Sequence, residues 1–222
     1  MTSLEQVRAR IADACTKSGR AADAVRLIAV SKTFPVERID ELLAQGQQLF
    51  GENRVQEAIE KVEHFAGRAD FHFIGHLQRN KAKQVIGRFA LIHGVDDPRL
   101  IHELGRRSVA AKLEQPILLQ VNSGDETTKS GVTEAQLPEL LDRAIETEGV
   151  TPVGLMTIPP RAEQPEDNRR WFARLRELRD REASRCGIPL PELSMGMTDD
   201  YKVAVEEGAT LVRVGRAIFG ER

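Results

Sequence analysis

A lysine stands at the end of the first apolar run of this chain, where its amine could do chemistry. Residues 26–34 read RLIAVSKTF, so that Lys32 follows a β-branched run with the composition of a buried strand. A lysine in such a place often only marks where a strand reaches the surface. The alternative is a nucleophilic amine that reacts, in its neutral form, with a carbonyl group. Position alone does not separate the two interpretations, so the rest of the chain has to.

Two glycine-containing segments near the C-terminus, residues 194–196 (SMG) and 214–217 (VGRA), could bind a phosphate group. At a turn from strand to helix, backbone N–H groups point at an anion, glycine lets the backbone approach, and serine adds a hydroxyl. A plain turn without a ligand would show the same pattern. The candidate residues are Ser194, Met195, Gly196, Gly215 and Arg216. Together with the amine of Lys32, they would suit a phosphorylated aldehyde.

Eight apolar runs alternate with amphipathic stretches along the chain, and these are the elements that must bring the candidate residues together. The predicted strands are VRLIAVS, QQLFGE, FHFIG, ALIHGV, PILLQVN, VTPVGLMTI, ELSMGM and TLVRVG. Eight strand-helix units in about 200 residues predict a parallel (β/α)8 TIM barrel, in which strand ends meet at one face. An open doubly wound sheet is the alternative, but the turn after the first strand lacks both GxGxxG and GxxxxGKS/T.

Composition limits the classes of function. The 222 residues include 32 basic and 34 acidic ones, for a formal charge of -2, so we expect no nucleic-acid partner. The longest apolar runs are too short to cross a bilayer, and the N-terminal segment reads as a charged amphipathic helix over about residues 2–18. We therefore expect a cytoplasmic protein without membrane contact. It would form one domain over residues 1–222, with the barrel at about 25–220 and two reduced cysteines.

The chain contains AVSKTFP, LFGENRVQEA, FHFIGHLQRNKAK, VNSGDETTKSG, GLMTI and SMGMTDDYKVAVEEGATLVRVGRAIFG. In this order and spacing the six segments resemble the pyridoxal phosphate homeostasis proteins of the YggS and PROSC type. The resemblance covers about residues 25–220. It implies a TIM barrel of PLP fold type III, related to the N-terminal domain of alanine racemase. It also implies that pyridoxal 5'-phosphate (PLP) is held on Lys32 as an internal aldimine.

The resemblance gives roles to the residues of the phosphate segments and to an arginine beside them. Ser194 and the backbone amides of Gly215 and Arg216 would hold the phosphate. The chain has Arg216 where other members have threonine or another small residue, so a hydroxyl contact from that position is not expected. Arg213 has the inward parity of Gly215 and would donate to the pyridine nitrogen, which then stays unprotonated and makes the ring a poorer electron sink. The alternative for Arg213 is an ion pair with a carboxylate at the barrel mouth.

Three further residues have less specific roles. Asn53 would flank the ring or its oxygen, and Met156 would pack on one face of it, although methionine at a strand end often only fills the core. Lys129, in the loop at 122–132, would either gate access of PLP or cap the loop. His72 and His76 are four apart but bracket a strand end, so we expect no metal site.

We expect a PLP carrier in intracellular PLP homeostasis, without catalytic residues and without efficient turnover. Racemisation needs an acid or base on each face of the cofactor. The related alanine racemases take one from a tyrosine on the partner's second domain, a domain that we do not expect in this chain. The only tyrosine, Tyr201, is expected to pack or to lie at the surface. PLP-dependent apo-enzymes are the expected partners, and a monomer is the expected state. The alternatives are an amino-acid racemase and an aldolase that uses Lys32 without a cofactor.

Overall fold

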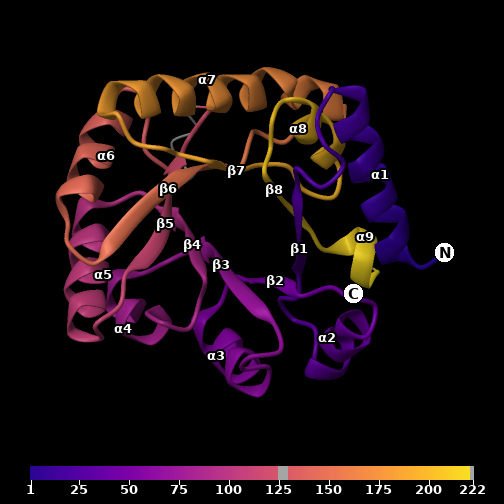
Figure 1. The fold of residues 1–222 in the computed structure, drawn as a ribbon, viewed down its shortest axis with the longest axis horizontal. Helices are drawn as coiled ribbons and strands as arrows, with labels where there is room; N and C mark the ends of the chain where they lie inside the picture. Colours follow the sequence, from indigo (N-terminus) through magenta and orange to yellow (C-terminus); the bar gives the residue numbers. More distant parts are fainter. Residues whose placement is uncertain (125–129, 221–222) are drawn as a thin grey trace.

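A computed structural model describes residues 1–124 and 130–220, and within these ranges eight parallel strands close into a barrel (Figure 1). Each strand pairs with the strands before and after it in the sequence, and β8 pairs with β1. The predicted TIM barrel is therefore confirmed, as is the extra N-terminal helix. No helix in the described ranges is long and apolar enough to cross a membrane.

The strands and helices follow one another in the predicted order. The strands are β1 (Arg26–Val30), β2 (Leu49–Glu52), β3 (Asp70–His76), β4 (Leu91–Val95), β5 (Gln115–Val121), β6 (Val150–Thr157), β7 (Glu192–Ser194) and β8 (Leu211–Val214). The α-helices are α1 (Ser3–Lys17), α2 (Val36–Leu43), α3 (Val55–His64), α4 (Ala82–Val85), α5 (Pro98–Ala110), α6 (Leu137–Glu146), α7 (Arg169–Cys186), α8 (Tyr201–Glu206) and α9 (Arg216–Phe219). Two short 3-10 helices lie at Arg79–Lys81 and Pro165–Asn168.

Alternate residues of each strand face opposite sides of the barrel wall, as a strand period of two requires. The interior cluster takes one side chain from each of five strands: Ile28, Leu91, Leu118, Met156 and Leu211. The outward residues pack beneath the helices in one large cluster, to which Ala29 and Phe50 belong. Lys32 is four residues after Ile28, and Arg213 is two residues after Leu211, so each has the strand position of an interior residue. The strands therefore direct both positions toward the inside of the barrel.

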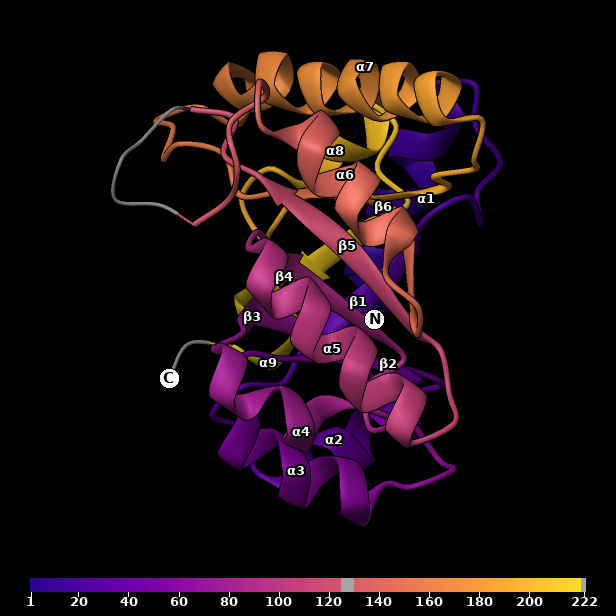
Figure 2. The ribbon, with the colours of Figure 1, turned by 90° about the vertical axis from the view of Figure 1, so that its left-hand side faces the viewer.

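Local signals explain where two of the helices begin. Thr2 and Glu5 form a reciprocal capping box at the start of α1, in which each side chain accepts a hydrogen bond from the other's backbone N–H. Asp97 caps α5 by accepting from the N–H of Arg99 at 2.8 Å, and Pro98 takes the first helical position. Figure 2 shows α5 and α6 side by side on the outside of the barrel.

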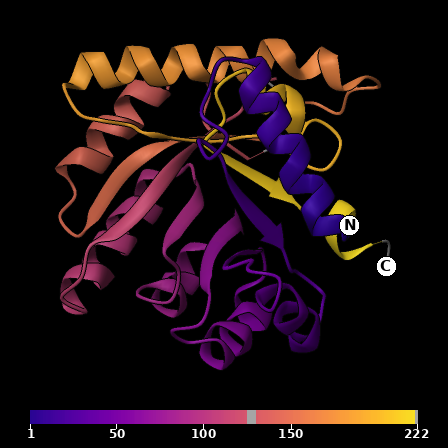
Figure 3. The ribbon, with the colours of Figure 1, turned by 45° about the vertical axis from the view of Figure 1, so that its right-hand side comes forward.

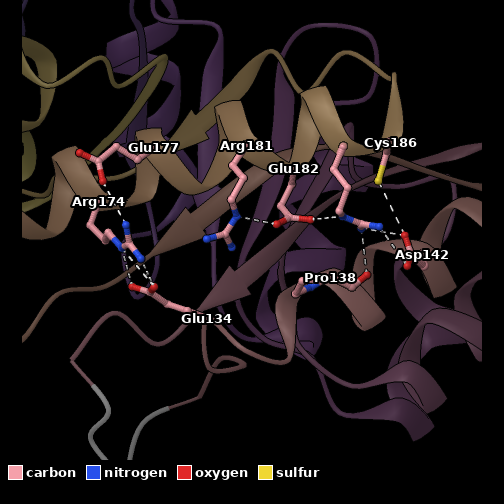
Figure 4. A network of polar contacts seen from close by, with 9 residues as sticks. Glu134, Pro138, Asp142, Arg174, Glu177, Arg181, Glu182 and Cys186 are labelled. Atoms are coloured by element: carbon pink, nitrogen blue, oxygen red, sulfur yellow. Dashed lines mark hydrogen bonds and ion pairs between the residues drawn. The ribbon is translucent and has the colours of Figure 1, made fainter.

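Charged pairs attach α7 to α6 and to the segment that precedes α6 (Figure 4). Arg174 contacts Glu134 at 2.6 Å, and Arg185 contacts both Asp142 at 2.7 Å and Glu182 at 2.6 Å. The side chain of Glu182 is buried and accepts from Arg181 at 2.9 Å as well as from Arg185. These contacts lie on the outer surface, so they hold the helical layer together without reaching the barrel interior.

Candidate functional site

Lys32 lies just beyond the end of β1, at the face of the barrel where the strands end. Its side chain is partly buried, and its amine has no hydrogen bond or ion pair to any residue that the structure describes. The next residue, Thr33, has a φ of +68°, a conformation that side chains other than glycine seldom adopt. An amine without a partner in a sharply turned loop is available to a ligand.

The candidate phosphate segments come next to this loop because β8 pairs with β1. The ring of Phe34, two residues after Lys32, stacks on Phe219 of α9 with centroids 4.5 Å apart. Gly215 is the residue before α9 and lies against Val30, where a Cβ would be 3.4 Å from the valine Cβ. The structure thus brings the amine-bearing loop and the VGRA segment together, as the sequence predicted.

Gly196 is needed for the turn after β7. Its φ is +89°, and a Cβ at this position would lie 2.5 Å from Cβ of Ala204. The neighbouring Met195 is fully buried in the outer cluster, and the side chain of Arg216 points away to an ion pair with Asp199 at 2.7 Å. Only the backbone of Arg216 is therefore left for an anion, which agrees with the absence of a hydroxyl at this position.

Arg213 is a buried cation on the inside of β8, with 4% of its surface exposed. Its Nη1 donates to Oγ of Ser194 at 2.5 Å, and its Nη2 donates to the backbone oxygen of Thr157 at 2.9 Å. No carboxylate of the described residues lies within ion-pair distance of it. Burial lowers the pKa of Arg213 to about 10, so it remains protonated at neutral pH. The alternative of an ion pair at the barrel mouth is therefore wrong for this part of the chain.

Two buried histidines extend the contacts of Ser194 across the barrel interior. Nδ1 of His93 lies 2.9 Å from Oγ of Ser194, and Nε2 of His93 lies 3.0 Å from Nδ1 of His72. Burial lowers the pKa of His72 to about 3, and burial with the charge of Arg213 nearby lowers the pKa of His93 well below its usual value. Both rings are therefore neutral at pH 7. Each then has one donor and one acceptor nitrogen, which suits a continuous chain of hydrogen bonds.

His93 was not predicted from the sequence, and His72 was considered only as a partner of His76. The structure separates that pair, since His72 is buried while His76 is exposed and lies 3.9 Å from a carboxylate oxygen of Asp96. A usable signal was present: His72 and His93 both occupy inward positions of the adjacent strands β3 and β4. Ser194 is inward on β7, so the parity of three strands would have placed these groups together.

The remaining predicted residues have clear positions. Asn53 follows β2, and its Oδ1 is buried without a hydrogen-bond partner among the described residues. Met156 belongs to the interior cluster, so its contact with a cofactor ring stays a prediction. Tyr201 is buried at the start of α8, which confirms that it packs in the core. Lys129 lies outside the described residues.

Comparisons with known proteins agree with this geometry. A family profile, "Alanine racemase, N-terminal domain", matches residues 2–222. The pyridoxal phosphate homeostasis protein of Aquifex aeolicus is 45% identical over 220 residues, 99% of this chain and 96% of that one. The protein of the same name from Escherichia coli is 38% identical over 229 residues, 99% of this chain and 95% of that one.

Solved structures are similar as well. PipY of Synechococcus elongatus, determined with PLP bound, is 36% identical and superimposes with a TM-score of 0.84 over 95% of this chain and 100% of that one. Alanine racemase of Clostridium difficile superimposes with a TM-score of 0.72 at 12% identity, over 89% of this chain and 53% of that one. At that identity the similarity concerns the fold alone.

Proposed function

This chain belongs to the pyridoxal phosphate homeostasis protein family, and on that premise we propose that it binds PLP at the barrel mouth and serves as an intracellular carrier of it. Lys32 is the proposed point of covalent attachment. The proposed binding residues are Lys32, Asn53, Met156, Ser194, Met195, Gly196, Arg213, Gly215 and Arg216.

The observation that carries the proposal is the buried charge of Arg213. A desolvated cation without a carboxylate partner among the described residues is costly, and a ligand that brings both an acceptor atom for the guanidinium and a negative charge into the site offsets that cost. PLP combines a phosphate group and an aromatic ring with a nitrogen acceptor, and thus matches a site that offers a buried guanidinium. Oδ1 of Asn53 and the amine of Lys32 both have no partner among the described residues. They fit the same ligand, since the two residues follow the ends of the adjacent strands β1 and β2.

Each protein group has a definite task in this proposal. When bound, PLP supplies an aldehyde that reacts with a primary amine. Lys32 supplies that amine. Arg213, held by Ser194 and the Thr157 carbonyl, donates to the ring nitrogen and keeps a proton from it. The backbone N–H groups of Gly215 and Arg216 and the hydroxyl of Ser194 bind the phosphate.

A carrier suits this site better than an efficient racemase. Two-base chemistry needs a second acid or base above the ring, and the only tyrosine of the chain is buried in the core. An arginine at the ring nitrogen also weakens the electron sink on which proton abstraction depends. We further propose that the protein acts in the cytoplasm as a monomer and passes PLP to apo-enzymes. The names of the similar proteins from Aquifex aeolicus and Escherichia coli support a role in PLP homeostasis.

The experiment is a PLP titration followed by chemical trapping. We expect the purified protein to show a visible absorption band with PLP, and borohydride reduction followed by peptide mass mapping to place the adduct on Lys32. Lys32→Ala should lose both signals, whereas Lys202→Ala, which removes an exposed lysine, should keep them. Arg213→Met should weaken PLP binding about ten- to hundredfold, since hydrogen bonds to charged groups contribute about 1.5–3 kcal/mol.

Two results would overturn the proposal. An adduct on another lysine, or no saturable binding, would exclude Lys32 as the attachment point. Steady racemisation of D- or L-alanine by the PLP-loaded protein would replace the carrier role with an enzymatic one.

A further inference from the structure

A second lysine, Lys61 of α3, is buried beside the loop that carries Lys32. Its exposed fraction is 5%, and its Nζ donates to the backbone oxygen of Ser31 at 2.8 Å, to Oε1 of Glu52 at 2.8 Å and to Oε1 of Glu57 at 2.9 Å. We propose that Lys61, with Glu52 and Glu57, positions Lys32 for PLP. This inference rests on the proposed function and adds residues outside the binding set.

The residue before Lys32 is fixed by this group at two atoms. The backbone oxygen of Ser31 accepts from Lys61, and the hydroxyl of Ser31 donates to Oε1 of Glu52 at 2.7 Å. Its N–H also donates to the backbone oxygen of Gly51, in β2, at 3.1 Å. The peptide that leads into Lys32 therefore has little freedom to rotate.

The residue after Lys32 is fixed from the same side. The N–H of Thr33 donates to Oε1 of Glu57, the oxygen that also accepts from Lys61. Thr33 has a positive φ of 68°, which a β-branched residue adopts only where surrounding contacts hold it. Lys32 itself has no such contact with the described residues. Its direction is thus set through its two neighbours, both of which depend on one buried ammonium.

A contribution to the stability of the fold does not by itself explain why Lys61, Glu52 and Glu57 are buried together. Glu52 is fully buried, one of its carboxylate oxygens has no partner among the described residues, and burial raises its pKa against the lowering effect of Lys61. Although burial alone would raise the pKa of Glu57, the hydrogen bonds from Lys61 and Thr33 lower it. Buried ion pairs recover their desolvation cost poorly, and their best-attested use is to select one geometry.

The sequence alone predicts only part of the group formed by Lys61, Glu52 and Glu57. In α3 the buried positions are 55, 58 and 61, and the third of these is a lysine where the apolar face predicts an apolar residue. A charged residue on the buried face of a helix, next to a loop with a reactive amine, is a signal that could have been followed. Glu57, four residues earlier on the same helix, could be read as a partner of that lysine in the same way. Ser31 and Glu52 could not, because they come from the loop after β1 and from the end of β2.

The first experiment changes Glu57 and leaves the Lys61–Glu52 pair in place. We expect Glu57→Ala to raise the Kd for PLP about tenfold, the equivalent of about 1.4 kcal/mol, and to shift the pH midpoint of the visible band. Glu57→Gln keeps an acceptor for the N–H of Thr33 and should restore most of the affinity. Glu60→Ala, on the exposed face of the same helix, should behave as wild type.

A second variant tests Lys61 directly. Lys61→Met alone leaves Glu52 as an uncompensated buried charge and could unfold the protein, so it is combined with Glu52→Gln. The double variant should fold and should bind PLP about tenfold more weakly, again with a shifted pH midpoint of the band. Borohydride trapping of each variant then measures how much of the adduct still forms on Lys32.

The outcomes separate the inference from the proposed function. If Glu57→Ala or the double variant lowers Tm but keeps the wild-type Kd and pH midpoint, the group only docks α3 and the inference is wrong. If wild type itself gives no Lys32 adduct, the proposed function fails and this inference fails with it. Weaker binding that Glu57→Gln restores, with an unchanged midpoint in Glu60→Ala, supports positioning.

Discussion

Four polar residues inside the barrel form one connected set, in which Arg213 is the charged member at neutral pH. Hydrogen bonds connect His72 to His93 and His93 to Ser194 across the barrel interior. Ser194 in turn accepts from the guanidinium of Arg213. Neutral histidines suit this place, because a second positive charge next to Arg213 would be repelled as well as desolvated. The set therefore holds Arg213 as a buried cation that faces the proposed ring site.

Acid should weaken the fold through these histidines. Burial lowers the pKa of His72 to about 3, while the unfolded chain has the usual value of 6.5. Between these two values the unfolded state binds more protons, so the free energy of unfolding decreases as the pH falls, by at most about 1.4 kcal/mol per pH unit for each histidine. Urea unfolding measured at several pH values between about 7 and 5 tests this window.

Two variants complete the test. His93→Gln removes one of the buried titrating groups and should flatten the pH dependence, whereas His102→Gln, on an exposed face of α5, should not. Carboxylates with lowered pKa act in a different range: contacts with Arg106 and Arg107 lower the pKa of Glu103 to about 2, so its effect begins below about pH 4.5. An unchanged slope in His93→Gln would contradict the role of the buried histidines.

At the scale of elements, each helix has to end where the chain turns back to the next strand. Gly187 ends α7 in the left-handed conformation with a φ of +67°, as glycine commonly does. The end of α5 has the same geometry with a different residue, since Lys112 has a φ of +57°. Its N–H donates to the backbone oxygen of Val109 at 3.0 Å, and its side chain is exposed.

Substitutions at these two helix ends should change the free energy of unfolding in opposite directions. Lys112→Gly removes the steric cost of the left-handed conformation and should raise the free energy of unfolding by up to about 1 kcal/mol, less the entropy that glycine adds to the unfolded chain. Gly187→Ala should lower it by about 1 kcal/mol, because the space around Gly187 is open and only the backbone conformation is strained. Urea unfolding checks both. Changes of the same sign would contradict this account.

At the scale of the whole molecule, the N-terminal helix α1 packs against the C-terminal end of the barrel. Figure 3 shows α1 along the outside of the barrel beside the C-terminal helices, where it packs on α8 and α9. The hydroxyl of Ser3 donates to the backbone oxygen of Ile218 at 2.8 Å, and Arg20 donates to the backbone oxygens of Val205 and Ala209. The helix and the segment after it thus attach to the chain on both sides of β8 and support the closure between β1 and β8.

A cavity under α1 should therefore destabilise the whole barrel. Leu4 is completely buried in the main cluster, and Leu4→Ala should lower the free energy of unfolding by about 2–5 kcal/mol. Thermal unfolding followed by circular dichroism measures this loss. Val109→Ala, which shortens an exposed side chain, is the control and should change little. A loss below about 1 kcal/mol for Leu4→Ala would show that α1 is only loosely attached.

The sequence by itself determined the eight-unit barrel, because strand and helix periods are local and parallel strands joined by helices have few ways to close. It also determined that Lys32 and the SMG and VGRA segments lie at one face, since all of them follow strand ends. The bonds of His93 to Ser194 and of Lys61 to Ser31 and Glu52 were decided only by the tertiary structure. Periodicity tells which side of a strand or helix a residue faces. Which side chains then come within 3 Å across the barrel depends on strand register and helix docking, which residues distant in sequence set together.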